Sequence, residues 1–254
     1  MKRMNADVSN IKTKIFLLPY AGSSVYNYIE WKKNFPNYME VCFLELAGRG
    51  SRMGEPFYET VEEAVDDIYR MMIPKVQGCK YYIYGHSMGS LIAFELYYKL
   101  LSMGDELPSQ LFLSGRNPPD LCMDIKKVSH LDDVLFLNEV SKYGGVPAQL
   151  YENDDARKIF VPILKADFRL LEEYKYKEYS EPINCDITVF YGKNDFSTSR
   201  EKMEKWKKHA AKDLTIVQFA GGHFFCTNLK ERSEIIKRII SINNITGKIV
   251  GGIM

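Results

Sequence analysis

The sequence lacks any close pair of cysteines. Its five cysteines are widely spaced, their number is odd, and no Cys-x-x-Cys motif occurs. This pattern disfavours a disulfide framework and a zinc site, and it favours buried, reduced thiols. We therefore expect neither a bound metal nor a cofactor. The cysteines are Cys42, Cys79, Cys122, Cys185 and Cys226.

Long apolar runs and an excess of charge of one sign are absent as well. The longest early apolar run, residues 15–21, is too short to cross a bilayer, and residues 1–14 are polar, without the apolar core of a secretory signal. Lysine and arginine number 34 against 33 acidic residues, a formal net charge of +1. This balance gives no reason to expect nucleic acid or an anionic membrane as partner. We expect a cytoplasmic protein, with a monomer as the working assumption.

What the sequence does contain is an alternation of short apolar runs with helical patterns. The 254 residues, 46% hydrophobic and 26% charged, fit a single globular domain spanning residues 1–254. The alternation predicts βαβ units in a mostly parallel central sheet with flanking helices, and strands without period-two patterning indicate that both sheet faces are covered. Strands are expected at residues 15–18, 41–44, 81–84, 110–114, 186–191 and 214–219, and helices at 60–76, 85–101, 200–212 and 229–242.

One stretch, about residues 116–180, interrupts the alternation. It shows no convincing strand, but helical patterns occur at about 131–142 and 154–174. An insertion of this size is typical of a helical lid over an active site, and the alternative is a structural subdomain away from it. Its apolar side chains could line a pocket, although packing is the commoner role of such residues. The pocket candidates are Met123, Leu131, Leu135, Tyr143 and Phe168.

A Gly-x-Ser-x-Gly motif stands at residues 85–89, between the third predicted strand and the helix that follows it. In the α/β-hydrolase fold a serine in this context sits on a strained turn that exposes its Oγ above the sheet. The following helix N-terminus favours developing negative charge. We predict that Ser87 is the nucleophile of such a fold, and the alternative is that Ser87 only caps the helix.

The general base should be a histidine that follows the serine and the acid along the chain. His223 meets this condition, because it follows the last predicted strand and a pair of glycines, in a loop that leaves the carboxyl edge of the sheet. The other three histidines fit less well. His86 adjoins the serine, His130 lies in the insertion, and His209 is on a lysine-rich helix whose polar face we expect to be solvated.

The acid should end the strand before the last one. Asp195 lies in the loop after the strand at residues 186–191, whereas Asp186 and Asp213 begin strands and therefore lie at the opposite edge. Asp195 would fix the tautomer of His223, which would take the proton of Ser87 and return it to the leaving group. The alternative for Asp195 is an ordinary solvated loop residue.

Two backbone N–H groups should bind the oxyanion that forms during acyl transfer. One belongs to the residue after the nucleophile, Met88, and the other to the loop after an early strand, residues 19–24. In that loop we favour Ala21, with Tyr20 as the nearest competitor. The alternative is that Pro19 and Gly22 simply form a turn.

Segments along nearly the whole chain resemble those of stand-alone type II thioesterases, which serve nonribosomal peptide and polyketide synthases. Three residues depart from the family's common choices, but none of them transfers a proton: Ala47, Lys165 and Phe196. The matching segments are residues 18–24, 46–52, 84–89, 162–168, 173–174, 191–195 and 221–225.

This resemblance implies a reaction and a partner. The family hydrolyses acyl thioesters on the phosphopantetheine arm of acyl- or peptidyl-carrier proteins, and so removes stalled or incorrect acyl groups. The residues alone indicate only a serine acyl hydrolase, so an esterase or lipase acting on small free esters remains an alternative, as does a non-catalytic binding protein. Four lysines could meet an acidic carrier protein, although a solvated helix face is the commoner role of such a run. They are Lys202, Lys205, Lys207 and Lys208.

Overall fold

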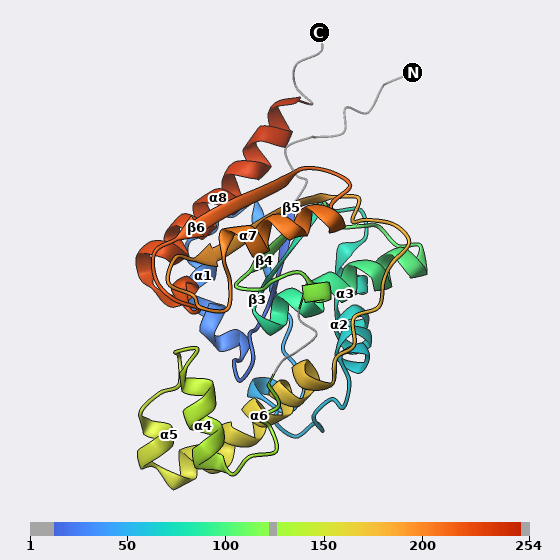
Figure 1. Cartoon of the computed structure of the whole chain (residues 1–254). Helices are drawn as coiled ribbons and strands as arrows, with labels where there is room; N and C mark the ends of the chain where they lie inside the picture. The colour runs from blue at the N-terminus through green and yellow to red at the C-terminus, as the bar shows by residue number, and fades with distance from the viewer. Residues whose placement is uncertain (1–12, 122–125, 250–254) are drawn as a thin grey trace, which may run out of the picture.

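Six parallel strands form one sheet at the centre of the molecule (Figure 1). The computed structural model describes residues 13–121 and 126–249. The strand order is β2-β1-β3-β4-β5-β6, as expected for a mostly parallel sheet built from crossover connections. The strands are β1 Thr13–Leu18, β2 Met39–Phe43, β3 Tyr81–His86, β4 Gln110–Ser114, β5 Asp186–Gly192 and β6 Leu214–Phe219.

Helices cover both faces of the sheet. The side chains of α2 Val61–Val76, α3 Met88–Met103 and α7 Arg200–Glu204 pack on one face. Those of α1 Ile29–Lys32 and α8 Leu229–Ile249 pack on the other. The strands β3 and β4 are buried along their whole length, which is why their sequences read as apolar runs rather than as alternating patterns.

All six predicted strands are confirmed, with ends that differ by no more than two residues. The helix expected at residues 200–212 is shorter than predicted, because the α-helix ends at Glu204 and continues as a 3₁₀ helix over Lys205–His209. Helix α8 is longer than predicted and continues to Ile249. The short helix α1 was not predicted; it begins directly after a 3₁₀ turn at Val25–Tyr28.

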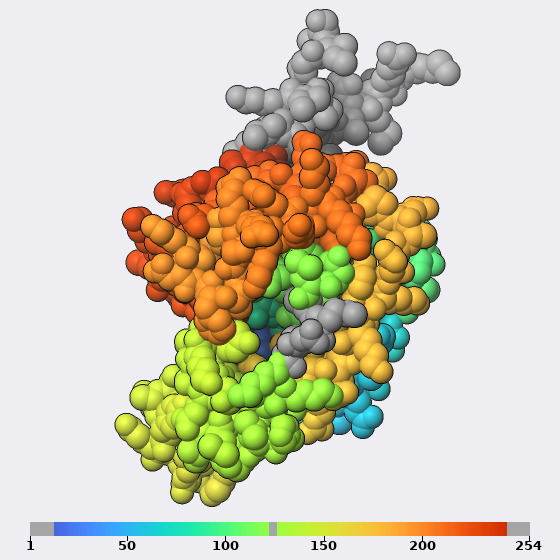
Figure 2. Space-filling view, viewed as in Figure 1, coloured from blue at the N-terminus to red at the C-terminus, as the bar shows by residue number. Residues whose placement is uncertain are grey.

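The chain between β4 and β5 forms a helical insertion. It contains α4 Asp133–Ser141, α5 Gln149–Glu152 and α6 Asp154–Glu173. Figure 1 shows α4 and α5 projecting away from the sheet, and Figure 2 shows a hollow between the insertion and the rest of the molecule. The insertion has its own apolar cluster, centred on Phe136 and Leu137 of α4 and Val161 of α6. Helix α6 therefore links this cluster to the main body.

The sequence also raised expectations about membrane spans and about the cysteines. Within the described residues, none of the helices combines the length and the apolar character needed to span a membrane. The four described cysteines are free thiols, and Cys42, Cys185 and Cys226 are buried. Cys122, like the pocket candidate Met123, lies outside the described residues.

Candidate active site

Ser87 occupies a strained turn between β3 and α3. Its backbone angles are φ 52° and ψ −110°, and among the described residues it is the only non-glycine residue with positive φ. Such a conformation persists only where the surroundings enforce it. Here the Ser87 N–H donates to the carbonyl of Ser114 at the end of β4, and the turn lifts the side chain above the carboxyl edge of the sheet.

The two glycines of the motif are required by close backbone contacts. A Cβ atom on Gly85 would lie 2.1 Å from the carbonyl oxygen of Gly89, and a Cβ atom on Gly89 would lie 2.6 Å from that of Leu18. These separations are far below van der Waals contact. The first turn of α3 can therefore approach β1 and β3 only because both side chains are absent.

The structure brings the three predicted triad side chains into one hydrogen-bonded row. His223 Nε2 lies 3.0 Å from Ser87 Oγ, and His223 Nδ1 lies 2.8 Å from Asp195 Oδ2. Asp195 follows β5 and His223 follows β6, so both loops leave the same edge of the sheet as Ser87. With Nδ1 protonated, His223 donates to the carboxylate and presents a free acceptor to the serine hydroxyl.

The Asp195 carboxylate is held in its ionised form. Burial alone would raise the pKa of Asp195, but hydrogen bonds from His223 and Ser197 outweigh it and lower the pKa from 3.8 to about 2. The backbone N–H and the Oγ of Ser197 donate to Oδ1 at 2.9 and 2.6 Å. Since Oδ2 faces His223, both carboxylate oxygens have partners, which fixes the plane in which the imidazole lies.

This pKa predicts a loss of stability in acid. A carboxyl whose folded pKa is about 2 stabilises the fold above pH 4, and this contribution of about 2 kcal/mol disappears as the pH falls through 2. Comparison with Asp195→Asn isolates the effect, because all other carboxyls are common to both proteins. Urea titrations from pH 6 to pH 2 should show the stability difference between the two proteins shrinking by that amount. A difference that stays constant with pH would contradict the prediction.

The predicted oxyanion donors belong to two separate segments, the start of α3 and the turn after β1. Met88 begins α3, and N–H groups in the first turn of a helix have no acceptor within the helix. Ala21 lies in a turn that is closed by a hydrogen bond from Ser23 N–H to the Tyr20 carbonyl, 3.0 Å long. Ser87, Ala21 and Tyr20 all line the same cavity. The choice of Ala21 over Tyr20 stays a prediction.

A cavity of about 1120 Å³ opens onto Ser87 and His223 and extends beneath the insertion. Of the five pocket candidates, Tyr143 and Phe168 line it. Leu131 packs against the apolar cluster of the insertion, and Leu135 is 52% exposed. Met123 is outside the described residues. A helical pattern does not show which side of a helix faces a cavity, so further lining residues on α5 and α6 were not predicted. They include Leu150, Phe160, Leu164 and Leu171, and Phe224 lines the cavity from the loop after β6.

The three remaining histidines take no part in this row. His86 is buried, which lowers its pKa, and its Nδ1 lies 2.8 Å from Ser114 Oγ. The expectation that His209 lies on a solvated face was wrong. His209 is buried, and its Nε2 lies 3.0 Å from Asp120 Oδ1. The 3₁₀ helix explains this, because its three-residue repeat places His209 directly behind the buried Trp206.

The remaining residues singled out from the sequence are His130, placed in the insertion, and four lysines. His130 is exposed, on the chain that leads into α4. The lysine side chains are exposed as well, which fits a solvated helix face, and nothing in the structure tests a role in binding a partner. They are Lys202, Lys205, Lys207 and Lys208.

Comparison with known proteins gives consistent matches along the chain. A family model described as "Thioesterase domain" matches residues 13–242. "Linear gramicidin dehydrogenase LgrE" of Brevibacillus parabrevis is 33% identical, covering 86% of this chain and 83% of that protein. "Gramicidin S biosynthesis protein GrsT" of Aneurinibacillus migulanus is 32% identical, over 87% and 86%. The crystal structure of ClbQ from the colibactin NRPS/PKS pathway has a TM-score of 0.86 at 31% identity, covering 92% of this chain and 99% of that one.

Proposed function

This chain belongs to the thioesterase family, and we propose that it is a type II thioesterase that hydrolyses acyl thioesters carried on the phosphopantetheine arm of carrier proteins. The observation that carries the proposal is the row of contacts from Asp195 through His223 to Ser87, which opens into a cavity large enough for an acyl group. GrsT is named as a protein of gramicidin S biosynthesis, and ClbQ belongs to the colibactin pathway. This supports the same kind of pathway here.

The proposed reaction has two halves. Ser87 Oγ attacks the thioester carbonyl while His223 Nε2 takes its proton, and the imidazolium then protonates the departing phosphopantetheine thiol. Water, activated by the same nitrogen, next cleaves the acyl-serine ester and releases the free acid. Asp195 stabilises the imidazolium that forms in each half. The N–H groups of Met88 and Ala21 would bind the oxyanion, and such a donor typically contributes about 10²- to 10³-fold to kcat.

The name of one relative refers to a different reaction. LgrE is described as a dehydrogenase, but no Gly-x-Gly-x-x-Gly segment of the dinucleotide-binding type occurs in this chain. The turn after β3, where the sheet meets α3, holds Ser87 instead of a phosphate-binding glycine loop. These features support hydrolysis rather than hydride transfer. We further propose that the protein is a cytoplasmic monomer and that it needs neither metal nor cofactor, since the phosphopantetheine belongs to the carrier-protein substrate.

A comparison of two substrates tests this function. One is an acyl group loaded as a thioester on a holo carrier protein, and the other is the oxygen ester of the same acid with a small alcohol. We expect kcat/KM to favour the carrier thioester by at least about 100-fold, since binding of the remote carrier lowers the barrier at the reacting centre. Ser87→Ala serves as the inactive control. A preference for the free oxygen ester would identify an esterase, and hydrolysis of neither substrate would favour a binding protein.

A further inference from the structure

The turn that carries Ala21 is held from the insertion by a buried carboxylate. Asp167 of α6 accepts a hydrogen bond from the N–H of Gly22, with 2.7 Å between the nitrogen and Oδ2. Gly22 directly follows Ala21, and the two residues are 145 and 146 positions from Asp167 along the chain. The N–H group that Asp167 binds is therefore only one residue away from the predicted oxyanion donor, the N–H of Ala21.

Arg49 completes this contact. Its Nη2 donates to Asp167 Oδ1 at 2.6 Å, and its Nη1 donates to Oδ2 and to the Ser23 carbonyl. The two side chains are only 3% and 1% exposed. The forked pair fixes the carboxylate plane, so the second lone pair of Oδ2 points at Gly22 N–H. Arg49 thus ties the loop after β2, the turn after β1 and helix α6 to a single carboxylate.

The turn itself depends on this hydrogen bond for its conformation. Gly22 has φ +73° and occupies the third position of the turn closed by Ser23 N–H and the Tyr20 carbonyl, as in a type II turn. The two common turn types differ in the orientation of their central peptide, here that between Ala21 and Gly22. Asp167 accepts from the N–H of this peptide and so holds it in the type II orientation. The Ala21 N–H belongs to the preceding peptide, so the hydrogen bond acts on it by anchoring the turn as a whole.

Helix α6 also contacts the turn by close packing. A Cβ atom on Gly22 would lie 2.5 Å from Leu164 Cδ1, and Leu164 precedes Asp167 by one turn of the same helix. Helix α6 therefore contacts Gly22 through two neighbouring side chains, the apolar Leu164 and the charged Asp167. Buried ion pairs add little net stability compared with apolar packing. The Arg49–Asp167 pair is therefore better suited to positioning the turn than to stabilising the fold.

We propose that Asp167, held by Arg49, is a positioning residue for the oxyanion hole, because it anchors the turn to α6 and so keeps the Ala21 N–H at the place from which it can bind the oxyanion. This inference rests on the proposed hydrolase function. If Asp167 has this role, the insertion does more than line the cavity, because it also helps to position a catalytic N–H group. Displacement of α6 would release the Ala21–Gly22 peptide and lower turnover without moving Ser87, His223 or Asp195.

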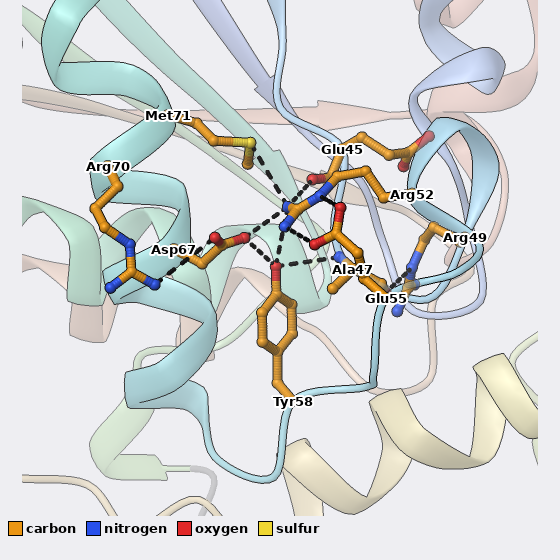
Figure 3. Close-up of polar contacts among 9 residues, drawn as sticks. All are labelled: Glu45, Ala47, Arg49, Arg52, Glu55, Tyr58, Asp67, Arg70 and Met71. Carbon is orange, nitrogen blue, oxygen red and sulfur yellow. Dashed lines mark hydrogen bonds and ion pairs between the residues drawn. The ribbon is translucent and has the colours of Figure 1, made fainter.

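A second ion pair on the same loop provides a matched control (Figure 3). Asp67 of α2 bonds Arg52 and Tyr58, and Tyr58 Oη accepts from the N–H of Ala47. This cluster braces the loop that carries Arg49, but in the described part of the chain the side chains of Arg52, Tyr58 and Asp67 make no hydrogen bond or ion pair with Gly22 or Asp167. Asp67→Asn therefore weakens the loop's support without removing the acceptor of the Gly22 N–H.

The test compares Asp167→Asn with Asp67→Asn. For Asp167→Asn we expect kcat on a simple acyl thioester to fall by about 10- to 100-fold, with KM within about threefold, because only transition-state binding is lost. Affinity for an alkyl trifluoromethyl ketone, whose adduct with Ser87 carries an oxyanion, should fall by a similar factor. Binding of a non-hydrolysable thioether analogue should not change. Asp67→Asn should leave kcat and the ketone affinity within about twofold.

Equal losses in ketone and thioether binding, or an unchanged kcat in folded Asp167→Asn, would overturn the inference. If Asp167→Asn does not fold, Arg49→Lys keeps the charge but removes the fork, and it should show the same split between kcat and KM. A wrong proposal for the function would give a different result: the wild-type protein would not release acyl groups from a carrier protein. The ratios between variants on the simple thioester are measurable in either case.

Discussion

Ser87→Ala and His223→Ala are each expected to lower kcat by about 10⁴- to 10⁶-fold, and the double variant should be scarcely slower than either single one. The reason is the single proton that moves between Oγ and Nε2, which are 3.0 Å apart. Once either group is missing, the other has nothing to donate to or accept from. Steady-state hydrolysis of an acyl thioester measures all three variants.

The control for this experiment is Ser102→Ala. Ser102 lies exposed on α3, the helix that follows Ser87, and its hydroxyl bonds only the carbonyl of Lys99 among the described residues. We expect kcat within twofold of wild type. Losses from the two triad substitutions that multiply in the double variant would contradict the account, because independent groups rather than a single catalytic unit would then be at work.

Gly85→Ala is expected to lower the stability of the fold strongly. The new carbon would lie 2.1 Å from the Gly89 carbonyl oxygen and 2.6 Å from the Ser90 nitrogen. Both are backbone atoms at the start of α3, so no side-chain rotation relieves the clash. Overpacking of this kind typically costs about 1–3 kcal/mol, and we expect the upper end of that range because β3 lies between two paired strands.

Urea denaturation of Gly85→Ala beside Gly54→Ala checks this expectation. No heavy atom lies within 4 Å of a Cβ on Gly54, and its φ is not in the left-handed region. Gly54→Ala should therefore keep the wild-type midpoint, and Gly85→Ala should lose a large part of its stability together with its activity. A Gly85→Ala protein with wild-type midpoint and turnover would show that the turn is not as tight as the structure has it.

The parts of the fold that the sequence predicted are those determined by local pattern and topology. Apolar runs between turn residues fixed the six strands, and the carboxyl-edge rule for parallel sheets placed Asp195 and His223 beside the serine. Each step needed only the order of elements along the chain. The three side chains then converge because the loops after β3, β5 and β6 leave the same edge.

The features that escaped prediction depend on contacts between distant segments. Arg49 and Asp167 both lie in segments that resemble the thioesterase family, but nothing in their spacing shows that two residues 118 positions apart share a bidentate contact. The burial of His209 escaped for another reason. A change from α- to 3₁₀-helix after Glu204 alters which residues share a face, and side-chain patterns assume one fixed repeat.

The most direct test of the central claim is the mass of the protein during turnover. Acid quenching within milliseconds of mixing with an acyl thioester, followed by intact-protein and peptide mass spectrometry, detects a covalent intermediate. The account predicts that the mass increases by one acyl group, that the adduct lies on Ser87, and that Ser87→Ala acquires none. Steady hydrolysis by the wild type without an adduct, together with full activity of Ser87→Ala, would contradict it.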